Sequence, residues 1–220
     1  MPADTKTRLL DHAERLFAAR GIPTTSVRDI VTAAGVNLGA ITYHFGSKNR
    51  LIRAVIERRL RPLNEERLRL LKQAEQAAAP SPPSLESVLR AAIAPTLGLM
   101  REHAPFMQIV GRMFSDPNSQ FQRRAEAKPL FRRFMRDLAS AVPHVPPEEL
   151  AWRVHFLRGA MIYTWTSAEQ LRVVPRGRAR PEDDATMVRR LIQFGAAGLR
   201  ASLSQSRTAG RSRKKRRTRR

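Results

Sequence analysis

One short segment, residues 35–48, concentrates side chains whose types and spacing suit contact with another molecule. Leu38, Ile41 and Phe45 recur at helical spacing, so they fall on one side of a helix and are expected to pack inward. The opposite side combines small and hydrogen-bonding residues: Gly39, Ala40, Thr42 and Tyr43, with His44 on the flank. Small residues let the helix backbone approach a partner closely. Such a face suits a groove of nucleic acid.

Catalysis is the competing chemistry, and the sequence offers little for it. The five histidines have no metal-ligand spacing; they are His12, His44, His103, His144 and His155. The chain has no cysteine, and it contains neither a glycine-rich phosphate loop nor an evident Ser/His/Asp grouping. We therefore predict that the protein is not an enzyme and holds no metal or cofactor.

Positive charge favours a nucleic-acid partner. The formal net charge is +22, and nine Arg and Lys residues without an acid lie within residues 205–220. This basic tail has almost no apolar content and is expected to be disordered. A basic surface attracts phosphate groups through counterion release without specifying a sequence. A bias in genomic base composition is the alternative source of part of the Arg excess.

Length and composition indicate a protein with a real hydrophobic core. The 220 residues, 42% of them apolar, are enough for one or two domains. The amino terminus lacks a hydrophobic signal core, and no run approaches about 18 apolar residues. The absence of cysteine is compatible with a reducing cytosol. We expect a cytoplasmic protein with no membrane partner.

The hydrophobic periodicity predicts an all-α fold of about nine helices, because no segment shows the alternation of a strand. Three short helices, near 5–20, 27–34 and 38–45, form a helix-turn-helix domain over residues 1–50. A long helix starts at Ser47 and is bent or broken at Pro62. The remaining helices are expected near 85–103, 106–114, 119–141, 147–171 and 182–203. They form a helical domain over residues 51–204, followed by the tail.

Residues 7–60 resemble the DNA-binding domain of the TetR family of bacterial transcriptional regulators. The matching features, in order, are residues 13–18, Gly21, residues 25–30, residues 33–36 and the run Tyr43-His44-Phe45-Gly46-Ser47-Lys48. This resemblance implies that Tyr43, His44 and Lys48 contact backbone phosphates. It also implies that Ser26 and Arg28 touch flanking phosphates, and that the base edges are faced by Asn37, Leu38, Gly39 and Thr42.

Each of these residues also has a purely structural interpretation. Ser26 is expected to cap the second helix, with Asp29 completing a capping box. Leu38 is more typical of a core position than of a base contact. Tyr43, taken alone, is typical of a half-buried tyrosine, and His44 of a surface histidine. The ordered motif around Tyr43 and His44 favours the DNA-binding interpretation.

The resemblance further implies that the larger helical domain binds a ligand and forms a homodimer. The last two helices carry apolar residues on more than one face, as expected if they also pack against a twofold partner. Aromatic and thioether side chains are the candidate pocket lining: Phe106, Met113, Phe131, Phe134, Phe156, Met161 and Trp165. Arg112 and His155 are candidates for an acidic ligand group. Core packing, or a salt bridge for the last two, is the alternative at each position.

A second, shorter resemblance concerns the effector. Residues 62–68, the Gly111-Arg112 pair and residues 155–160 resemble the subgroup of TetR regulators that contains fatty-acid-responsive repressors. It implies a fatty acid or its coenzyme A ester as the ligand. The leading hypothesis is a repressor that leaves a palindromic operator in double-stranded DNA when a small hydrophobic ligand binds, with coupling near Pro62. The alternatives are an activator of the same fold and a non-specific basic nucleic-acid-binding protein.

Overall fold

The computed structural model describes residues 4–115, 129–167, 170 and 184–202. Every regular element within these ranges is a helix, which confirms the predicted all-α class. The basic tail, residues 205–220, lies outside the described residues, as does the first part of the helix expected at 119–141.

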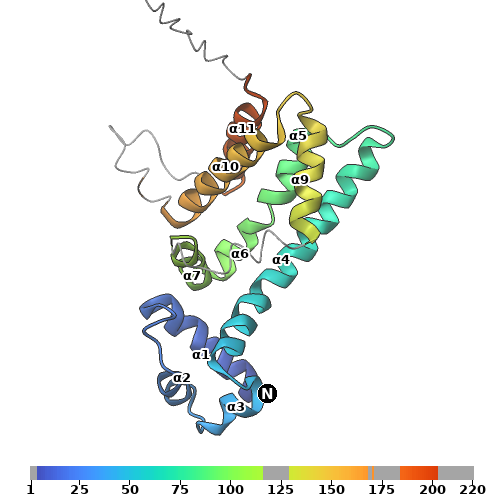
Figure 1. Cartoon of the computed structure of the whole chain (residues 1–220). Coiled ribbons are helices and arrows are strands. Elements are labelled where there is room, and N and C mark those ends of the chain that lie inside the picture. Colours follow the sequence, from blue (N-terminus) through green and yellow to red (C-terminus); the bar gives the residue numbers. More distant parts are fainter. Residues whose placement is uncertain (1–3, 116–128, 168–169, 171–183, 203–220) are drawn as a thin grey trace, which may run out of the picture.

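Three helices form the head at one end of an elongated molecule (Figure 1). They are α1 (Thr5–Arg20), α2 (Val27–Ala34) and α3 (Gly39–Phe45). Apolar residues at helical spacing face one another across the three helices, so Leu9, Phe17, Ile30 and Ile41 are buried in one cluster. The three-helix arrangement predicted for this part of the chain is therefore present.

The long helix α4 (Lys48–Ala78) runs from the head along the rest of the molecule, which we call the body (Figure 1). Ser47 Oγ accepts a hydrogen bond of 3.3 Å from the Arg50 N–H and so caps the first turn. The sequence predicts that Pro62 bends or breaks this helix. In the structure α4 is one helix that continues through Pro62. Pro62 lies on the exposed side, whereas Leu63 and Leu71 beyond it are buried. Burial of that apolar face stabilises the helix past the proline.

Three shorter helices follow: α5 (Leu85–Ile93), α6 (Thr96–Glu102) and α7 (Ala104–Ser115). The single helix expected at 85–103 is interrupted at Pro95, because proline has no backbone N–H to continue the hydrogen-bond pattern. The interruption separates α6 from α5. It places α6 and α7 beside the head, while α5 lies higher in the body (Figure 1).

The far end of the body contains α9 (Pro129–Ala141), α10 (Pro147–Ser167) and α11 (Asp184–Arg200). Together with α5 and the distal part of α4 they bury a second hydrophobic cluster, which includes Leu71, Leu89, Leu138, Leu157 and Leu199. This distal core is separate from the cluster in the head.

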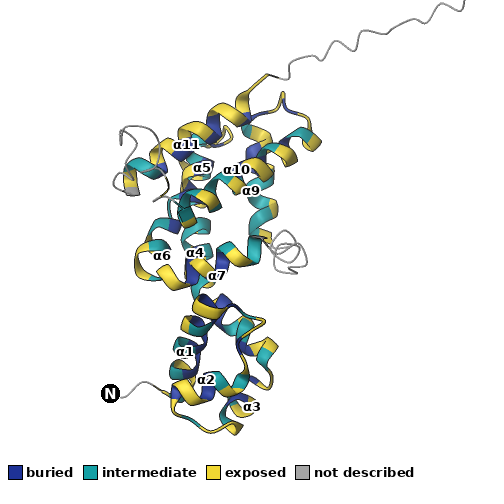
Figure 2. Cartoon of the chain, turned by 90° about the vertical axis from the view of Figure 1, so that its left-hand side faces the viewer, coloured by how far each residue is buried: buried dark blue, intermediate teal, exposed yellow. Residues whose placement is uncertain are grey.

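The head's cluster extends beyond the head. It continues through Leu51 and Val55 of α4 to Leu99 of α6 and to Phe106 and Ile109 of α7. Figure 2 shows buried residues where the head meets α4 and α7. We call this cluster the proximal core. A domain boundary at residue 50 remains a prediction, since α4 begins there but the hydrophobic core continues across it.

The start of α2 yields a stability prediction. Ser26 Oγ accepts a hydrogen bond of 3.1 Å from the Asp29 N–H, and Asp29 Oδ2 accepts one of 2.7 Å from the Ser26 N–H, so the predicted capping box is confirmed. Ser26→Ala should lower the free energy of unfolding by about 1 kcal/mol. Urea denaturation measures this. Ser26→Asn keeps a capping oxygen and should lose less; equal losses in both variants would contradict the capping role.

Candidate nucleic-acid interface and ligand cavity

The helix α3 separates a buried side from an exposed side. Ile41 and Phe45 are buried in the proximal core, while Gly39, Thr42 and Tyr43 are exposed. Tyr43 is 85% exposed, which is unusual for a large aromatic side chain without a partner. The exposed side of α3 therefore combines close backbone access with a hydroxyl and a phenol, as the periodicity predicts.

Leu38 does not pack inward as its spacing suggests, because 52% of its surface is exposed. Leu38 lies directly before Gly39, the first residue of α3, and its backbone is already helical, so helical spacing alone did not determine its burial. The Asn37 side chain caps this start, since Asn37 Oδ1 accepts a hydrogen bond of 3.0 Å from the Ala40 N–H. Leu38 thus lies with Gly39 and Thr42 on the exposed side, where an apolar contact to a thymine methyl is possible.

The turn between α2 and α3 is held by contacts that orient the exposed side. Gly35 ends α2 with φ of 61°, a left-handed conformation that favours glycine. The Arg8 guanidinium of α1 donates hydrogen bonds to the Ala34 and Gly35 carbonyl oxygens beside it. α1 therefore holds the turn that precedes α3.

The side chains expected at phosphates lie around α3. Arg28 is exposed on α2. The rings of Tyr43 and His44 meet edge to face with centroids 4.9 Å apart. Lys48 Nζ donates a hydrogen bond of 3.0 Å to the Ile22 carbonyl oxygen in the α1–α2 loop. Its charge therefore also braces that loop, and phosphate contact by Lys48 remains a prediction.

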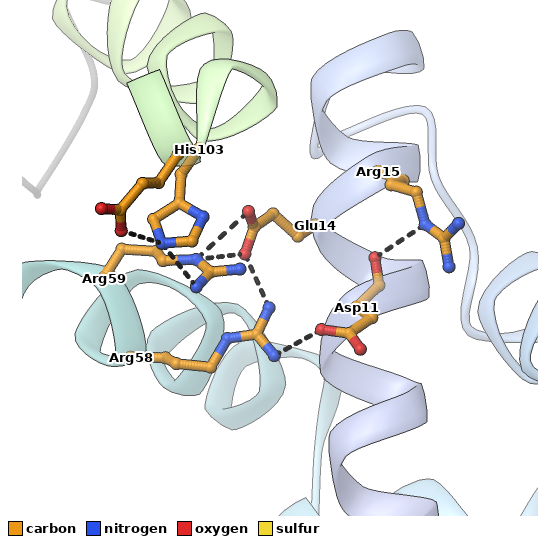
Figure 3. Close-up of polar contacts among 7 residues, drawn as sticks. Asp11, Glu14, Arg15, Arg58, Arg59 and His103 are labelled. Carbon is orange, nitrogen blue, oxygen red and sulfur yellow. Dashed lines mark hydrogen bonds and ion pairs between the residues drawn. The ribbon is translucent and has the colours of Figure 1, made fainter. Parts of the chain in front are cut away.

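A buried carboxylate joins the head to the body (Figure 3). Glu14 of α1 is 5% exposed and receives hydrogen bonds from Arg58 at 2.7 Å and Arg59 at 2.9 Å, both on α4. Arg58 also binds Asp11 at 2.7 Å, and Arg59 Nη1 lies 3.1 Å from His103 Nε2 at the end of α6. Two guanidinium groups thus compensate one desolvated carboxylate and connect three helices.

Arg112 makes a second connection between head and body. From α7 it donates hydrogen bonds of 3.3 Å and 3.4 Å to the Phe17 and Ala19 carbonyl oxygens near the end of α1. A cation near the carbonyl end of a helix is also favoured by the helix dipole. The structure places Arg112 at the head–body contact and not at the ligand cavity described next.

A cavity of about 250 Å³ lies between the proximal and distal cores. Its wall is mostly apolar and comes from α4, α5, α6, α7, α9 and α10. Four of the expected residues line it: Phe131, Phe134, Met161 and Trp165. A largely apolar, concave space with a few polar groups is typical of a small-molecule site.

The other expected lining residues lie elsewhere. Phe106 is fully buried in the proximal core, and Met113 packs against the same core. His155 and Arg112, the two candidates for an acidic ligand group, both border a second hollow of about 620 Å³ between α7 and α10. Phe156 is 63% exposed on the outer surface of α10. Helical spacing identifies an apolar face but not whether a core, a cavity or solvent lies against it.

The polar residues of the cavity wall were not predicted from the sequence. Asn64 and Arg67 of α4 line the cavity with Leu60 and Leu63, as does Thr96 of α6. Residues 60, 63, 64 and 67 have the spacing of one helical face, so the signal was present in the sequence. The interruption expected at Pro62 separates Leu60 from the other three residues, so the sequence did not indicate that all four share one face.

Large aromatic side chains are exposed on the outside of α10 and α11. On α10 they are Trp152, Phe156 and Tyr163, and on α11 Phe194. The Trp152 and Phe156 rings lie 5.8 Å apart and form a contiguous apolar surface. We call these four residues the aromatic patch. An apolar patch of this kind commonly marks a protein interface.

Neither a membrane-spanning helix nor a metal-binding cluster is present in residues 4–115, 129–167, 170 and 184–202. No helix within them combines the length and apolarity that crossing a membrane requires. No three His, Asp or Glu side chains among them are grouped closely enough to hold a metal ion.

Comparison with known proteins matches two parts of the chain to two family models. Residues 9–55 match the model described as "Bacterial regulatory proteins, tetR family". Residues 90–198 match the model described as "Tetracyclin repressor-like, C-terminal domain". The two matches cover the head and most of the body, respectively.

Curated relatives resemble mainly the head. The transcriptional repressor KstR2 of Rhodococcus jostii is 45% identical over 51 residues, which is 23% of this chain and 25% of that protein. The regulator AcrR of Shigella flexneri is 39% identical over 87 residues, which is 40% of this chain and 37% of that protein. The chain thus spans well under half the length of these relatives.

Solved structures resemble the whole fold. A TetR-like regulator from Rhodococcus sp. RHA1 has a TM-score of 0.60 at 20% identity and covers 92% of this chain and 100% of its own. SmeT, the repressor of a multidrug efflux pump of Stenotrophomonas maltophilia, has a TM-score of 0.61 at 19% identity, covering 90% and 89%. At this identity the likeness concerns the fold alone.

Tyr43 provides the test of the exposed side of α3. Tyr43→Ala removes an exposed ring, so the free energy of unfolding should change by no more than about 0.5 kcal/mol. Affinity for DNA fragments selected by the wild-type protein should fall about tenfold, because a hydrogen bond to a charged phosphate is lost. A gel-shift titration measures this, with Lys72→Ala on α4 as the control. Unchanged affinity would remove α3 from the interface.

Proposed function

Because the chain belongs to the TetR family of bacterial regulatory proteins, we propose that it is a dimeric, sequence-specific repressor that a small apolar ligand releases from DNA. One observation carries the proposal: the cavity lies between the core that holds the head and the core that holds the distal helices. A ligand there touches helices that also contact α1. The role is regulatory and not catalytic, and it places the protein in the cytoplasm, with the DNA.

The exposed side of α3 reads the operator. Asn37, Leu38, Gly39 and Thr42 face the base edges, where the Thr42 hydroxyl or methyl and the Leu38 side chain can discriminate among base pairs. Phosphate contacts by Ser26, Arg28, Tyr43, His44 and Lys48 set the register of the helix on the duplex. The formal charge of +22 strengthens this contact without adding specificity.

Helices α6 and α7 couple the cavity to the head. Thr96 and Leu99 of α6 line the cavity, and His103 at the end of the same helix lies 3.1 Å from Arg59 of the Glu14 cluster. Met107 and Val110 of α7 line the cavity, while Arg112 binds α1. A ligand that favours another position of these helices shifts the heads away from their DNA-binding spacing. This route replaces the one expected at Pro62, which lies on the exposed side of an uninterrupted α4.

The aromatic patch on α10 and α11 is the dimer surface. A second copy that covers Trp152, Phe156 and Phe194 removes their apolar area from water. A twofold dimer presents two copies of α3 to successive major grooves, about 34 Å apart on B-DNA. A palindromic operator follows from this symmetry.

The effector is a slim apolar molecule such as a fatty acid. About 250 Å³ lies near the lower end of small-molecule sites, so the cavity encloses an acyl chain more readily than the bulky head group of a coenzyme A ester. An activator of the same fold is the second candidate, because the position of the operator relative to the promoter decides the direction of regulation.

Selection of bound fragments from genomic DNA tests the proposal. Fragments enriched at a fixed salt concentration should share an inverted repeat, and apolar ligands should release them in a gel-shift assay. Enrichment without any shared sequence would instead indicate a non-specific nucleic-acid-binding protein.

The basic tail provides the matched control for this selection. Deleting residues 205–220 should weaken binding to random DNA and flatten its dependence on salt, because up to nine positive charges are removed. The same inverted repeat should still be enriched. Loss of that preference in the truncated protein would assign sequence recognition to the tail.

Phe156 tests the dimer surface. Phe156→Glu places a charge within the aromatic patch, so the protein should sediment as a monomer in analytical ultracentrifugation and lose affinity for the two-half-site operator. Lys72→Glu, an exposed charge change on α4, should leave the dimer intact. A stable dimer of the Phe156 variant would place the interface elsewhere.

A further inference from the structure

Arg67 of α4 is a positive charge inside the protein without a carboxylate partner. Its Nε donates a hydrogen bond of 2.9 Å to the Ala92 carbonyl oxygen. One terminal nitrogen donates to Asn64 Oδ1 at 3.4 Å and the other to Thr96 Oγ1 at 3.1 Å. All three acceptors are neutral. Among the described residues, no carboxylate forms an ion pair with Arg67, in contrast to Arg58, Arg59 and Arg133.

The guanidinium retains donor capacity that the protein does not use. Arginine has five N–H groups, and the three hydrogen bonds leave one N–H on each terminal nitrogen. The neutral partners fix the plane of the group. Such a fixed pair of donors matches the two oxygens of a carboxylate.

The cavity wall around Arg67 is cationic and rich in donors. The charged side chains that line it are Arg67 and Arg158, and no acidic residue belongs to the described lining. Trp165 also lines the cavity, and its indole Nε1–H is buried without a hydrogen-bond partner. An indole N–H can only donate. The Trp165 indole and the two remaining N–H groups of Arg67 are therefore donors that acceptor atoms of a bound molecule would satisfy.

The energetic cost of burying the Arg67 charge also favours an anionic ligand. Burial lowers the pKa of Arg67 to about 10, so the charge is desolvated yet still present at neutral pH. Arg67 keeps some accessible surface, and it lines the cavity. A desolvated charge without a counter-ion is costly, and an anion that enters the cavity offsets that cost.

From this arrangement we infer that the effector is an amphipathic anion whose carboxylate binds Arg67 while its apolar body fills the rest of the cavity. The inference rests on the proposed role of the cavity as the effector site and adds the class of ligand. Arg67 contacts α5 through Ala92 and α6 through Thr96. A carboxylate on the two remaining N–H groups binds beside these hydrogen bonds, and α6 in turn reaches the Glu14 cluster through His103.

Matched probes separate the head group from the apolar body. Decanoate and decanol have chains of equal length, and isothermal titration calorimetry on the full chain gives their affinities. The wild-type protein should bind decanoate about 10- to 100-fold more tightly than decanol, the range expected for hydrogen bonds to charged groups. In Arg67→Met, decanoate affinity should fall to that of decanol, whose own affinity should stay unchanged.

Two further variants keep the test decisive. Arg67→Gln serves as a second neutral variant if Arg67→Met fails to fold, as judged by circular dichroism. Arg69→Met removes an exposed arginine two residues along α4, which pairs with Glu66, and should retain the full preference for decanoate. Equal wild-type affinities for both probes, absence of binding by either, or a preference that survives in the neutral Arg67 variants would each overturn the inference.

DNA binding, measured on the same samples, shows whether a negative result concerns the anionic ligand alone or also the proposed function. A protein that binds its selected operator but shows no preference for decanoate contradicts the anionic ligand alone. A protein that selects no sequence contradicts the repressor, whatever it binds in the cavity.

Discussion

The position of the head on α4 depends on a buried ionic contact. Glu14 is almost fully removed from water, and a desolvated carboxylate is stable only when opposite charges and hydrogen-bond donors surround it. Arg58 and Arg59 of α4 provide both. Because Arg8 on the same α1 also holds the turn before α3, the orientation of the exposed side of α3 follows from how α1 sits on α4. Any device that moves the head has to act on this contact or beside it.

The cavity lies where a bound ligand can act on the contact between head and body. It separates the proximal core from the distal core, and its wall includes residues of α6 and α7, whose other contacts are with α1 and with the Glu14 cluster. Interiors are close-packed, so filling or emptying such a space displaces helices as units. The buried charges Glu14 and Arg67 differ in the kind of partner they have. Glu14 has two guanidinium partners, whereas Arg67 has only neutral ones.

Much of the head was predictable from local signals. The capping box at Ser26, the glycine turn at Gly35 and the inward side of Ile41 and Phe45 depend on neighbours within one or two turns, and all are present. Leu38 was wrongly expected to pack inward, because it has helical backbone angles at the start of α3 but remains exposed there. In the body the same reasoning found Phe131 and Trp165 at the cavity, but it also placed Phe156 there, which lies on the outer surface.

The pattern of residues was therefore sufficient for the helical class and for the short helices of the head, because helix periodicity and capping are local properties. It could not show which apolar face meets a cavity, which arginine lacks a carboxylate partner or which residues join the head to the body. Those features arise from side chains far apart in sequence, as with Glu14 and Arg59 or Arg112 and Phe17. A charge on a helix looks the same in the sequence whether its partner is an acid, a carbonyl oxygen or a ligand, and only packing in three dimensions separates Arg67 from Arg58.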